Sequence, residues 1–204
     1  MSEPRGWHSR GYLPHIDAEN TYQFLTWHLA DSLPIELAAK WRADLQHLDD
    51  HQRQRQYYRR LEKHLDLGFG SQLLKDLVAA KIVQDSLIFG HGERYVLSAW
   101  SVMPTHVHCI LRCNPGWTLS EIVQGIKGFT AHQINKKLGR TGQLWQEDYF
   151  DRMIRNEQHF HRTLKYIEWN AVKAKLCTDP THWIHCSANP IAKNLLLSKN
   201  SLTT

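Results

Sequence analysis

The sequence predicts an α+β fold in which helices pack on an antiparallel sheet. Two strand patterns at 94–103 and 106–113 are joined by a tight link that contains Pro104, which favours a hairpin. A third strand pattern at 22–29 is rich in aromatic and β-branched residues. The long segments between the strands carry apolar residues at helical spacing, so we expect helices to cover the sheet.

The other elements follow in order along the chain. Residues 1–19 are polar and punctuated by Pro and Gly, so we expect an irregular arm there. After the first strand, Asp31 or Ser32 offers a cap for a helix. Thr118 and Glu121 can form a capping box, and the helical patterns lie at 35–65, 72–87, 118–138 and 157–176.

The chain shows no internal repeat and no linker that would divide it, so residues 1–190 are expected to form a single domain. Residues 143–154 are aromatic and mixed, and we expect them to be partly extended. Asn156 follows as the cap of the last long helix. Residues 191–204 are rich in Ser, Lys, Leu and Thr, which predicts a flexible tail.

Composition limits the function classes without selecting one. A net charge of +5 over 204 residues permits a nucleic-acid partner but does not require one. Fourteen His and eight Trp can serve phosphate contact and base stacking. No apolar run reaches the roughly 18 residues of a membrane span, no signal peptide opens the chain, and the four Cys form no paired knuckles. We therefore expect a cytoplasmic protein without a membrane partner.

The segment 103–111 carries the first candidate site. Side chains alternate across a strand, so His106, His108 and Ile110 share one face, and the opposite face is apolar. Two imidazoles side by side on a rigid strand make half of a metal site. The alternative is a strand with two polar residues at an open edge, because a His-x-His pattern is short and common.

The second half of a site lies on the last long helix. Tyr166 and Asn170 are four residues apart and share a helix face, and Lys173 extends the same stripe. A Tyr hydroxyl is a poor nucleophile at its usual pKa of about 10, but it can attack a phosphate that a metal polarises. An Asn carbonyl would complete a His-His-Asn ligand set. The alternative is that this helix face lies at the edge of the core, with the Tyr hydroxyl exposed to solvent and the Asn on the surface.

These segments carry a resemblance. His106-Val-His108 resembles the motif of the HUH-superfamily endonucleases, and the segment from Tyr166 to Leu176 resembles the tyrosine helix of their single-tyrosine transposase branch. More closely, the chain is similar to the REP-associated tyrosine transposases, which are domesticated relatives of small insertion-sequence transposases. Further segments that carry the resemblance are 11–15, 29–34, 99–104, 127–130, 144–146 and 150–155.

The resemblance implies a ferredoxin-like HUH core, with helices on one face of the sheet and the histidines on a central strand. It implies that Tyr166 is the nucleophile and that His106, His108 and Asn170 hold Mg²⁺ or Mn²⁺. The implied substrate is single-stranded DNA beside a REP-type palindromic hairpin, cut through a 5′-phosphotyrosine link that leaves a free 3′-OH. Such a transposase would be associated with the nucleoid, and either a monomer or a homodimer fits.

The chain departs from the family pattern at several positions. Ala171 replaces the usual Pro after Asn170, and Ala is the better helix former, so we expect no loss of chemistry. Thr105 replaces an Asn, which puts a loop hydrogen bond in doubt. Residues 183–187 depart from a Trp-Pro-Trp-Ser-Ser pattern, so we expect different DNA contacts there. Residues 35–89 resemble the helical insertion of the longer members.

Basic residues beside these segments are candidates for DNA contact. A run of arginines and tyrosines at 51–60 suits a phosphate backbone, although a solvated helix face explains it as well. The candidates are Arg152, Arg155, Lys173, Lys127, Arg53, Arg55 and Arg59.

Three alternatives stay open. Tyr149 is a rival nucleophile, but Glu147 and Asp148 beside it would repel a phosphate, and Met153 stands where a ligand would be needed. The whole chain could also be a hairpin-binding protein that has lost cleavage, or a zinc hydrolase that uses the His-x-His pair. His159 and His161 lie on the same helix as Tyr166, and we expect them to be surface groups.

Overall fold

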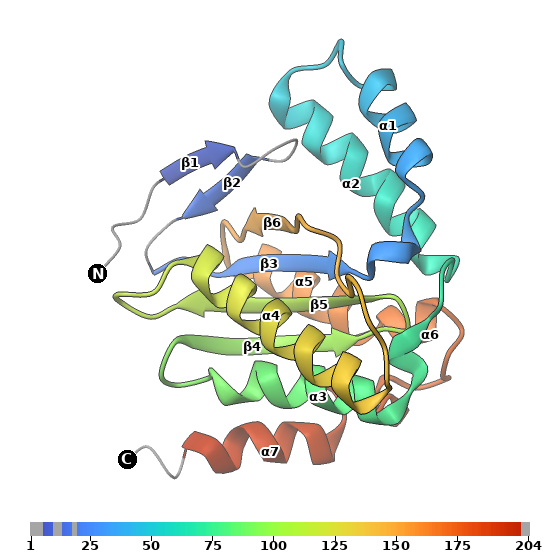
Figure 1. The fold of residues 1–204 in the computed structure, drawn as a ribbon. Helices are drawn as coiled ribbons and strands as arrows, with labels where there is room; N and C mark the ends of the chain where they lie inside the picture. The colour runs from blue at the N-terminus through green and yellow to red at the C-terminus, as the bar shows by residue number, and fades with distance from the viewer. Residues whose placement is uncertain (1–5, 10–13, 18–19, 201–204) are drawn as a thin grey trace.

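The computed structural model describes residues 6–9, 14–17 and 20–200, with a four-stranded antiparallel sheet at its centre (Figure 1). Its strands lie in the order β4-β5-β3-β6. They are β3 (Gln23–His28), β4 (Tyr95–Val102), β5 (His106–Cys113) and β6 (Phe150–Met153). The predicted α+β fold and the β4–β5 hairpin are confirmed, and β5 lies between β4 and β3.

The helices follow the predicted segments with shifted ends. They are α1 (Ile35–Asp44), α2 (Asp50–Asp66), α3 (Leu77–Phe89), α4 (Leu119–Lys137), α5 (Glu157–Glu168), α6 (Asn170–Lys173) and α7 (Pro190–Asn200). The pattern at 35–65 is divided because Asp49 caps α2 by accepting from the Gln52 amide. The pattern at 157–176 is divided at Trp169. None of the described helices combines the length and apolar character that crossing a membrane requires.

Helices cover both faces of the sheet, whereas the resemblance implied one covered face. Val107, Cys109 and Leu111 point into a core shared with α3 and α4. Ile110 points into a second core that α2 and α5 complete. In Figure 1, α3 and α4 lie in front of the sheet and α5 lies behind it. Because side chains alternate along β5, both histidines belong to the α5 side.

The loop after β3 is built differently from the prediction. Neither Asp31 nor Ser32 caps α1, which follows Pro34 without a side-chain cap. Ser32 instead lies with its hydroxyl 2.8 Å from His28 Nδ1. Asp31 accepts from the backbone amide of Ser71 at 2.9 Å. The Ser32 contact therefore holds the loop after β3 to the sheet, and the Asp31 contact holds it to the segment that precedes α3.

Two expectations about the ends of the chain are wrong where the structure describes them. Residues 6–9 and 14–17 pair as the antiparallel strands β1 (Gly6–Ser9) and β2 (Pro14–Asp17), instead of forming an irregular arm. The expected flexible tail is helical through α7, because Ala192 and Leu196 are four residues apart and pack on the α3 side of the core. Residues 11–13 of the resemblance segment 11–15 and residues 201–204 of the tail lie outside the described residues.

The predicted capping box of α4 gives a stability test. The Glu121 amide donates to Thr118 Oγ1 at 3.3 Å, and the Thr118 amide donates to Glu121 Oε2 at 3.0 Å. Thr118→Ala should lower the free energy of unfolding by about 1 kcal/mol in urea titrations. Glu121→Gln keeps an oxygen acceptor and should lose less. Equal losses in the two variants would contradict the reciprocal cap.

Candidate active site

The two histidines of β5 lie side by side beneath α5. The strand register places His106 opposite His28 and His108 opposite Thr26. Both imidazoles are buried, with ring centroids 4.6 Å apart. His108 Nδ1 lies 2.7 Å from Thr26 Oγ1, and His106 Nδ1 lies 3.0 Å from Thr105 Oγ1. Each ring is thus held by a hydroxyl through its Nδ1 atom, and Thr105 supplies one of these contacts.

Helix α5 brings the phenol of Tyr166 to this pair. Asn156 caps the helix, as predicted, by accepting from the His159 amide at 2.8 Å. Ile167 is fully buried in the core between α5 and the sheet, which fixes the face that the helix presents. The Tyr166 hydroxyl lies 3.5 Å from His108 Nε2. The predicted meeting of the phenol with the imidazole pair is therefore present.

Asn170 is buried at the junction of α5 and α6. Its side chain has no exposed surface, and neither amide atom has a hydrogen-bond partner among the described residues. The preceding Glu168 carbonyl lies 3.9 Å from Cys186 Sγ. Cys186 forms a β-bridge with Ser101, which is the β4 partner of His108. The junction that carries Asn170 therefore lies over the histidine end of the sheet.

The donor set fits a divalent cation. His106 Nε2 and the amide oxygen of Asn170 are buried and without a partner in the described part of the chain. Leaving such groups unpaired costs about 1–3 kcal/mol each. Two imidazole nitrogens and an amide oxygen are suitable ligands, and they leave positions open for water or phosphate oxygens. His106, His108 and Asn170 are thus the residues that could hold a metal.

Burial also keeps both imidazoles in the form that binds metals. Desolvation is the main cause of the lowered pKa of each ring: the pKa of His106 falls well below its usual value, and that of His108 falls to about 3. Lys173 lowers both further through its charge. The rings are neutral at pH 7, as metal coordination requires.

The surroundings of Tyr166 work against its ionisation. Burial raises the pKa of the hydroxyl, and the carboxylates of Glu62 and Asp66 at the end of α2 raise it further. The phenol therefore holds its proton until positive charge comes close to it. A cation held by the neighbouring histidines and Asn170 would supply that charge.

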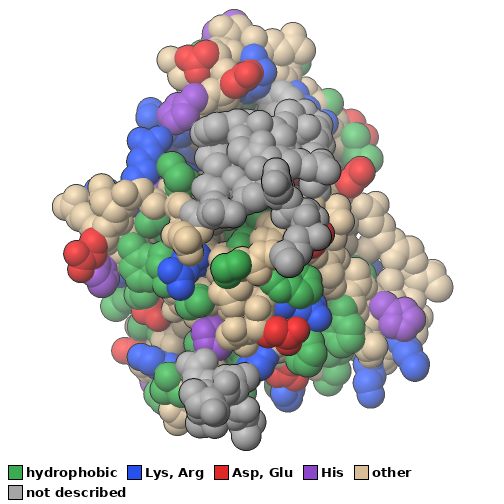
Figure 2. All heavy atoms as spheres, turned by 90° about the vertical axis from the view of Figure 1, so that its left-hand side faces the viewer, with side chains coloured by type: hydrophobic (Ala, Val, Ile, Leu, Met, Phe, Trp, Pro, Cys, Tyr) green, Lys and Arg blue, Asp and Glu red, His purple; other side chains and the backbone are tan. Residues whose placement is uncertain are grey.

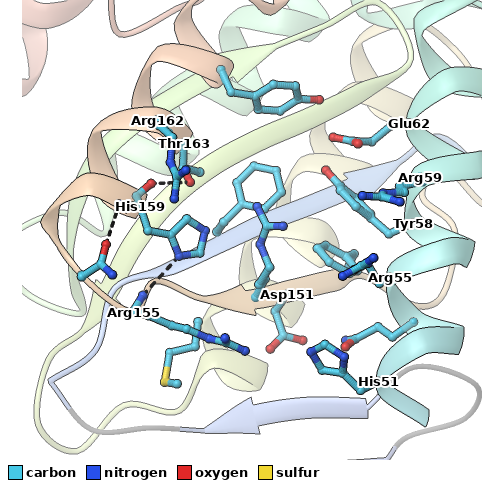
Figure 3. Close-up of a pocket in the computed structure, with 17 residues that line it drawn as sticks. His51, Arg55, Tyr58, Arg59, Glu62, Asp151, Arg155, His159, Arg162 and Thr163 are labelled. Atoms are coloured by element: carbon cyan, nitrogen blue, oxygen red, sulfur yellow. Dashed lines mark hydrogen bonds between the residues drawn. The ribbon is translucent and has the colours of Figure 1, made fainter. Parts of the chain in front are cut away.

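A cleft of about 710 Å³ opens beside Tyr166, between α2 on one side and β6 and α5 on the other (Figure 3). Figure 3 shows Arg55 and Arg59 of α2 across the cleft from Arg155 and Arg162. Phe24, Tyr58 and Phe150 add aromatic surface to its lining. In Figure 2, Lys, Arg and His side chains gather on the upper left of the molecule, below the α1–α2 tip. The cleft combines cations with aromatic rings, which suits a nucleic-acid strand.

The structure brings some of the predicted basic residues to this cleft and leaves others elsewhere. Arg55, Arg59, Arg152 and Arg155 line it. Lys173 pairs with Asp66 at 2.6 Å and lies over the Tyr166 ring. Lys127 Nζ donates to the carbonyls of residues 146 and 147 at 2.7 Å. Arg53 pairs with Asp50 and donates to the Leu48 carbonyl. A DNA contact stays a prediction for all seven.

Three residues of the site were missed from the sequence, and the place of a fourth, Tyr58 of the run at 51–60, was not predicted. Arg162 lies one turn before Tyr166, and this spacing could have suggested it. Tyr58 and Glu62 share a face of α2 with Arg55 and Arg59. The sequence could predict this shared face, but it could not predict which part of the sheet the face contacts. Thr26 gave no sequence signal, because its role depends on the register of β3 with β5.

The alternative residues fall in other places. The Tyr149 ring is buried in the core cluster that contains Trp27 and Trp145. His161 is exposed and lies 3.5 Å from Glu157. His159 differs from the expected surface group, because it lines the cleft and lies 3.3 Å from the Arg155 amide.

Comparison with known proteins finds a family match over part of the chain. Residues 88–170 match the family described as transposase IS200 like. This range includes both histidines and Tyr166, and it ends on Asn170. It leaves out α1 and α2, which lie in the segment 35–89 that the resemblance interprets as an insertion.

Two further matches are to REP-associated tyrosine transposases. A REP-associated tyrosine transposase of Escherichia coli strain K12 is 29% identical over 94 residues, which are 44% of this chain and 52% of the relative. The chain therefore spans about half the length of that curated relative. A solved REP-associated tyrosine transposase bound to a REP hairpin has a TM-score of 0.56 and 20% identity, covering 96% of this chain and 88% of its own. This second match shows a shared fold, and together the findings confirm the resemblance to this group.

The buried amide gives a test of the donor set. Asn170→Leu removes two unpaired polar atoms at similar volume, so its stability in EDTA should equal or exceed that of the wild type. With Mn²⁺ at 100 times its Kd, the wild type should gain about 2.7 kcal/mol, and the variant should gain much less. Urea titrations with and without Mn²⁺ measure both effects. A variant that is destabilised in EDTA and still gains fully from Mn²⁺ would exclude Asn170 as a ligand.

Proposed function

We propose that this protein is a metal-dependent single-stranded DNA endonuclease and strand transferase that acts at REP-type palindromic hairpins through a 5′-phosphotyrosine intermediate. The observation that carries the proposal is the meeting of the Tyr166 hydroxyl with His108 Nε2, 3.5 Å apart, four residues before a buried Asn170 whose amide has no partner among the described residues. The similarity to the IS200-like transposases over residues 88–170 supports this reaction class.

The chemistry assigns a role to each side chain. Mg²⁺ or Mn²⁺ bound by His106, His108 and Asn170 would polarise a phosphate and neutralise charge that develops on it. Tyr166 Oη forms the bond to phosphorus and loses its proton, while the bond to the 3′ oxygen breaks and that oxygen is protonated. The phosphotyrosine ester retains the energy of the phosphodiester bond that was broken. Attack by a 3′-OH therefore reverses the step and rejoins strands without ATP.

The cleft supplies the strand path in this proposal. Arg55, Arg59, Arg152, Arg155 and Arg162 would contact phosphates on both sides, and the aromatic lining would stack on bases. Phosphate contacts position a strand without reading its sequence, so recognition of the hairpin requires base contacts elsewhere.

Replacing the nucleophile is the central test. Tyr166→Phe removes only the attacking oxygen, so covalent adduct formation with a single-stranded REP substrate should fall to the detection limit. Hairpin affinity should change little, because the ring and its contacts with Phe24 and His108 remain. Denaturing gels with labelled DNA and Mn²⁺ measure the adduct, and gel shifts measure the affinity.

The same assay separates the second candidate function, a hairpin-binding protein without cleavage. The carboxylates that raise the Tyr166 pKa are the observation that favours it. If the wild type binds the hairpin but forms no adduct with Mg²⁺ or Mn²⁺, the binding function holds and the nuclease proposal fails. A full adduct from Tyr166→Phe would also exclude the assigned nucleophile.

Neighbouring arginines on α2 give a matched test of the strand path. Arg59 lines the cleft, whereas Arg60 pairs with Asp44 at 2.8 Å and is not among the lining residues. Arg59→Ala should weaken single-stranded DNA binding and make the slope of log Kobs against log salt shallower by about 0.7, the value for one phosphate contact. Arg60→Ala should leave the slope unchanged. Identical slopes for the two variants would place the strand elsewhere.

A further inference from the structure

A chain of polar contacts leads from the candidate metal ligand His108 into the helical insertion. His108 Nδ1 lies 2.7 Å from Thr26 Oγ1, and the same oxygen lies 3.2 Å from the Tyr58 hydroxyl. Burial raises the pKa of the Tyr58 hydroxyl, and the charges of Tyr166 and of Glu62, one turn further along α2, raise it further. Figure 3 shows the Glu62 carboxylate close to the Tyr58 hydroxyl, on a side chain from the same helix. Three side chains from β5, β3 and α2 are thereby connected, and a carboxylate lies beside the last of them.

The side chains in this series of polar contacts are held rigidly. Thr26 and His108 are each 1% exposed, and Tyr58 is 5% exposed. Thr26 faces His108 directly because the two residues are register partners in the sheet. The Tyr58 ring stacks on Phe150 with centroids 3.7 Å apart and an interplanar angle of 14°. Buried groups fixed in this way can impose one hydrogen-bond arrangement.

The Glu62 end of this series of contacts sets the direction in which its hydrogen bonds are donated. A carboxylate only accepts hydrogen bonds, so its charge favours the orientation in which the Tyr58 hydroxyl turns its proton toward Glu62. The Tyr58 oxygen then accepts from the Thr26 hydroxyl, and Thr26 Oγ1 accepts from His108 Nδ1–H. This order places the proton of the neutral imidazole on Nδ1, and it leaves a lone pair on Nε2. That atom is the one that lies 3.5 Å from the Tyr166 hydroxyl.

We propose that Thr26, Tyr58 and Glu62 are positioning residues that hold His108 as its Nδ1–H tautomer, with Nε2 directed at the cation and at Tyr166. The inference rests on the proposed function, because the Nδ1–H tautomer is useful to the site only if Nε2 binds a cation. Partners of this kind fix the orientation and basicity of metal-binding histidines, and their loss typically costs 10- to 100-fold in metal affinity or activity.

The proposal gives the helical insertion a role in the site. Tyr58 and Glu62 lie outside residues 88–170, the part that matches the transposase family. The end of α2 is anchored to α6 by the ion pair of Asp66 with Lys173 at 2.6 Å. Because Lys173 follows Asn170 by three residues, this contact joins the insertion to the helix that carries the third ligand. The insertion is thus connected to the ligand set from two sides.

An isosteric pair of substitutions at Thr26 tests this series of hydrogen bonds, which we call the relay. Thr26→Val removes the hydroxyl at constant shape, and Thr26→Ser keeps it. Histidine-selective ¹⁵N NMR of the full-length, metal-free protein, assigned with His108→Gln, reports the tautomer of His108. We expect Nδ1–H in the wild type and in Thr26→Ser, and a shift to Nε2–H or a mixture in Thr26→Val. An unchanged tautomer in Thr26→Val would overturn the proposal.

Loss of the next hydroxyl is compared with a matched control. Tyr58→Phe removes a hydroxyl of the relay, and Tyr95→Phe removes a buried hydroxyl that donates to the Leu87 carbonyl at 2.7 Å, in the core on the other face of the sheet. Calorimetry should show Mn²⁺ affinity lowered about tenfold in Tyr58→Phe and Thr26→Val. Tyr95→Phe and Thr26→Ser should bind as the wild type does.

The outcomes separate the inference from the proposed function. Equal Mn²⁺ affinities in Tyr58→Phe and Tyr95→Phe would assign Tyr58 a structural role only and overturn the relay. If the wild type forms no DNA adduct, the proposed nuclease fails, while the tautomer comparison at Thr26 still decides the inference. If Tyr58→Phe does not fold, the two Thr26 variants carry the test alone.

Discussion

The register between β3 and β5 is the constraint on which the site depends. It sets Thr26 against His108 and His28 against His106, so a row of polar side chains crosses the α5 face of the sheet. A slip of one residue would turn the histidines toward the core of Val107 and Leu111, in which apolar side chains predominate. The two apolar cores on either side of β5 fix this register, because each accepts only alternate side chains.

The electrostatics of the cleft are divided between opposite charges. Glu62 and Asp66 disfavour the phenolate of Tyr166, whereas five arginines in the lining attract phosphate. Acidic neighbours served to discount Tyr149 as a nucleophile, yet Tyr166 has such neighbours as well. What distinguishes Tyr166 is that its hydroxyl lies 3.5 Å from one imidazole of the His106–His108 pair, where a bound cation would offset the carboxylates.

Local chemistry explains which features were readable from the sequence. The alternation along 106–111, the Thr118–Glu121 box and the Asn156 cap are short-range patterns, and each is present in the structure. The contact between Tyr166 and His108 followed from a family resemblance, because no local rule brings residues 58 positions apart together. The roles of Thr26, Tyr58 and Glu62 were missed because they depend on strand register and on where α2 docks, and both are tertiary properties.

The same reasoning explains why the break between α5 and α6 matters. A continuous helix through 176 was expected, and the division at Trp169 leaves Asn170 as the first residue of a short helix, fully buried. Two unpaired polar atoms in such a place are a cost that a hydrophobic residue would avoid. A ligand that coordinates the amide oxygen would offset this cost. The Asn170 amide and His106 Nε2 both lack a partner among the described residues, and this supports the proposal that they bind a cation.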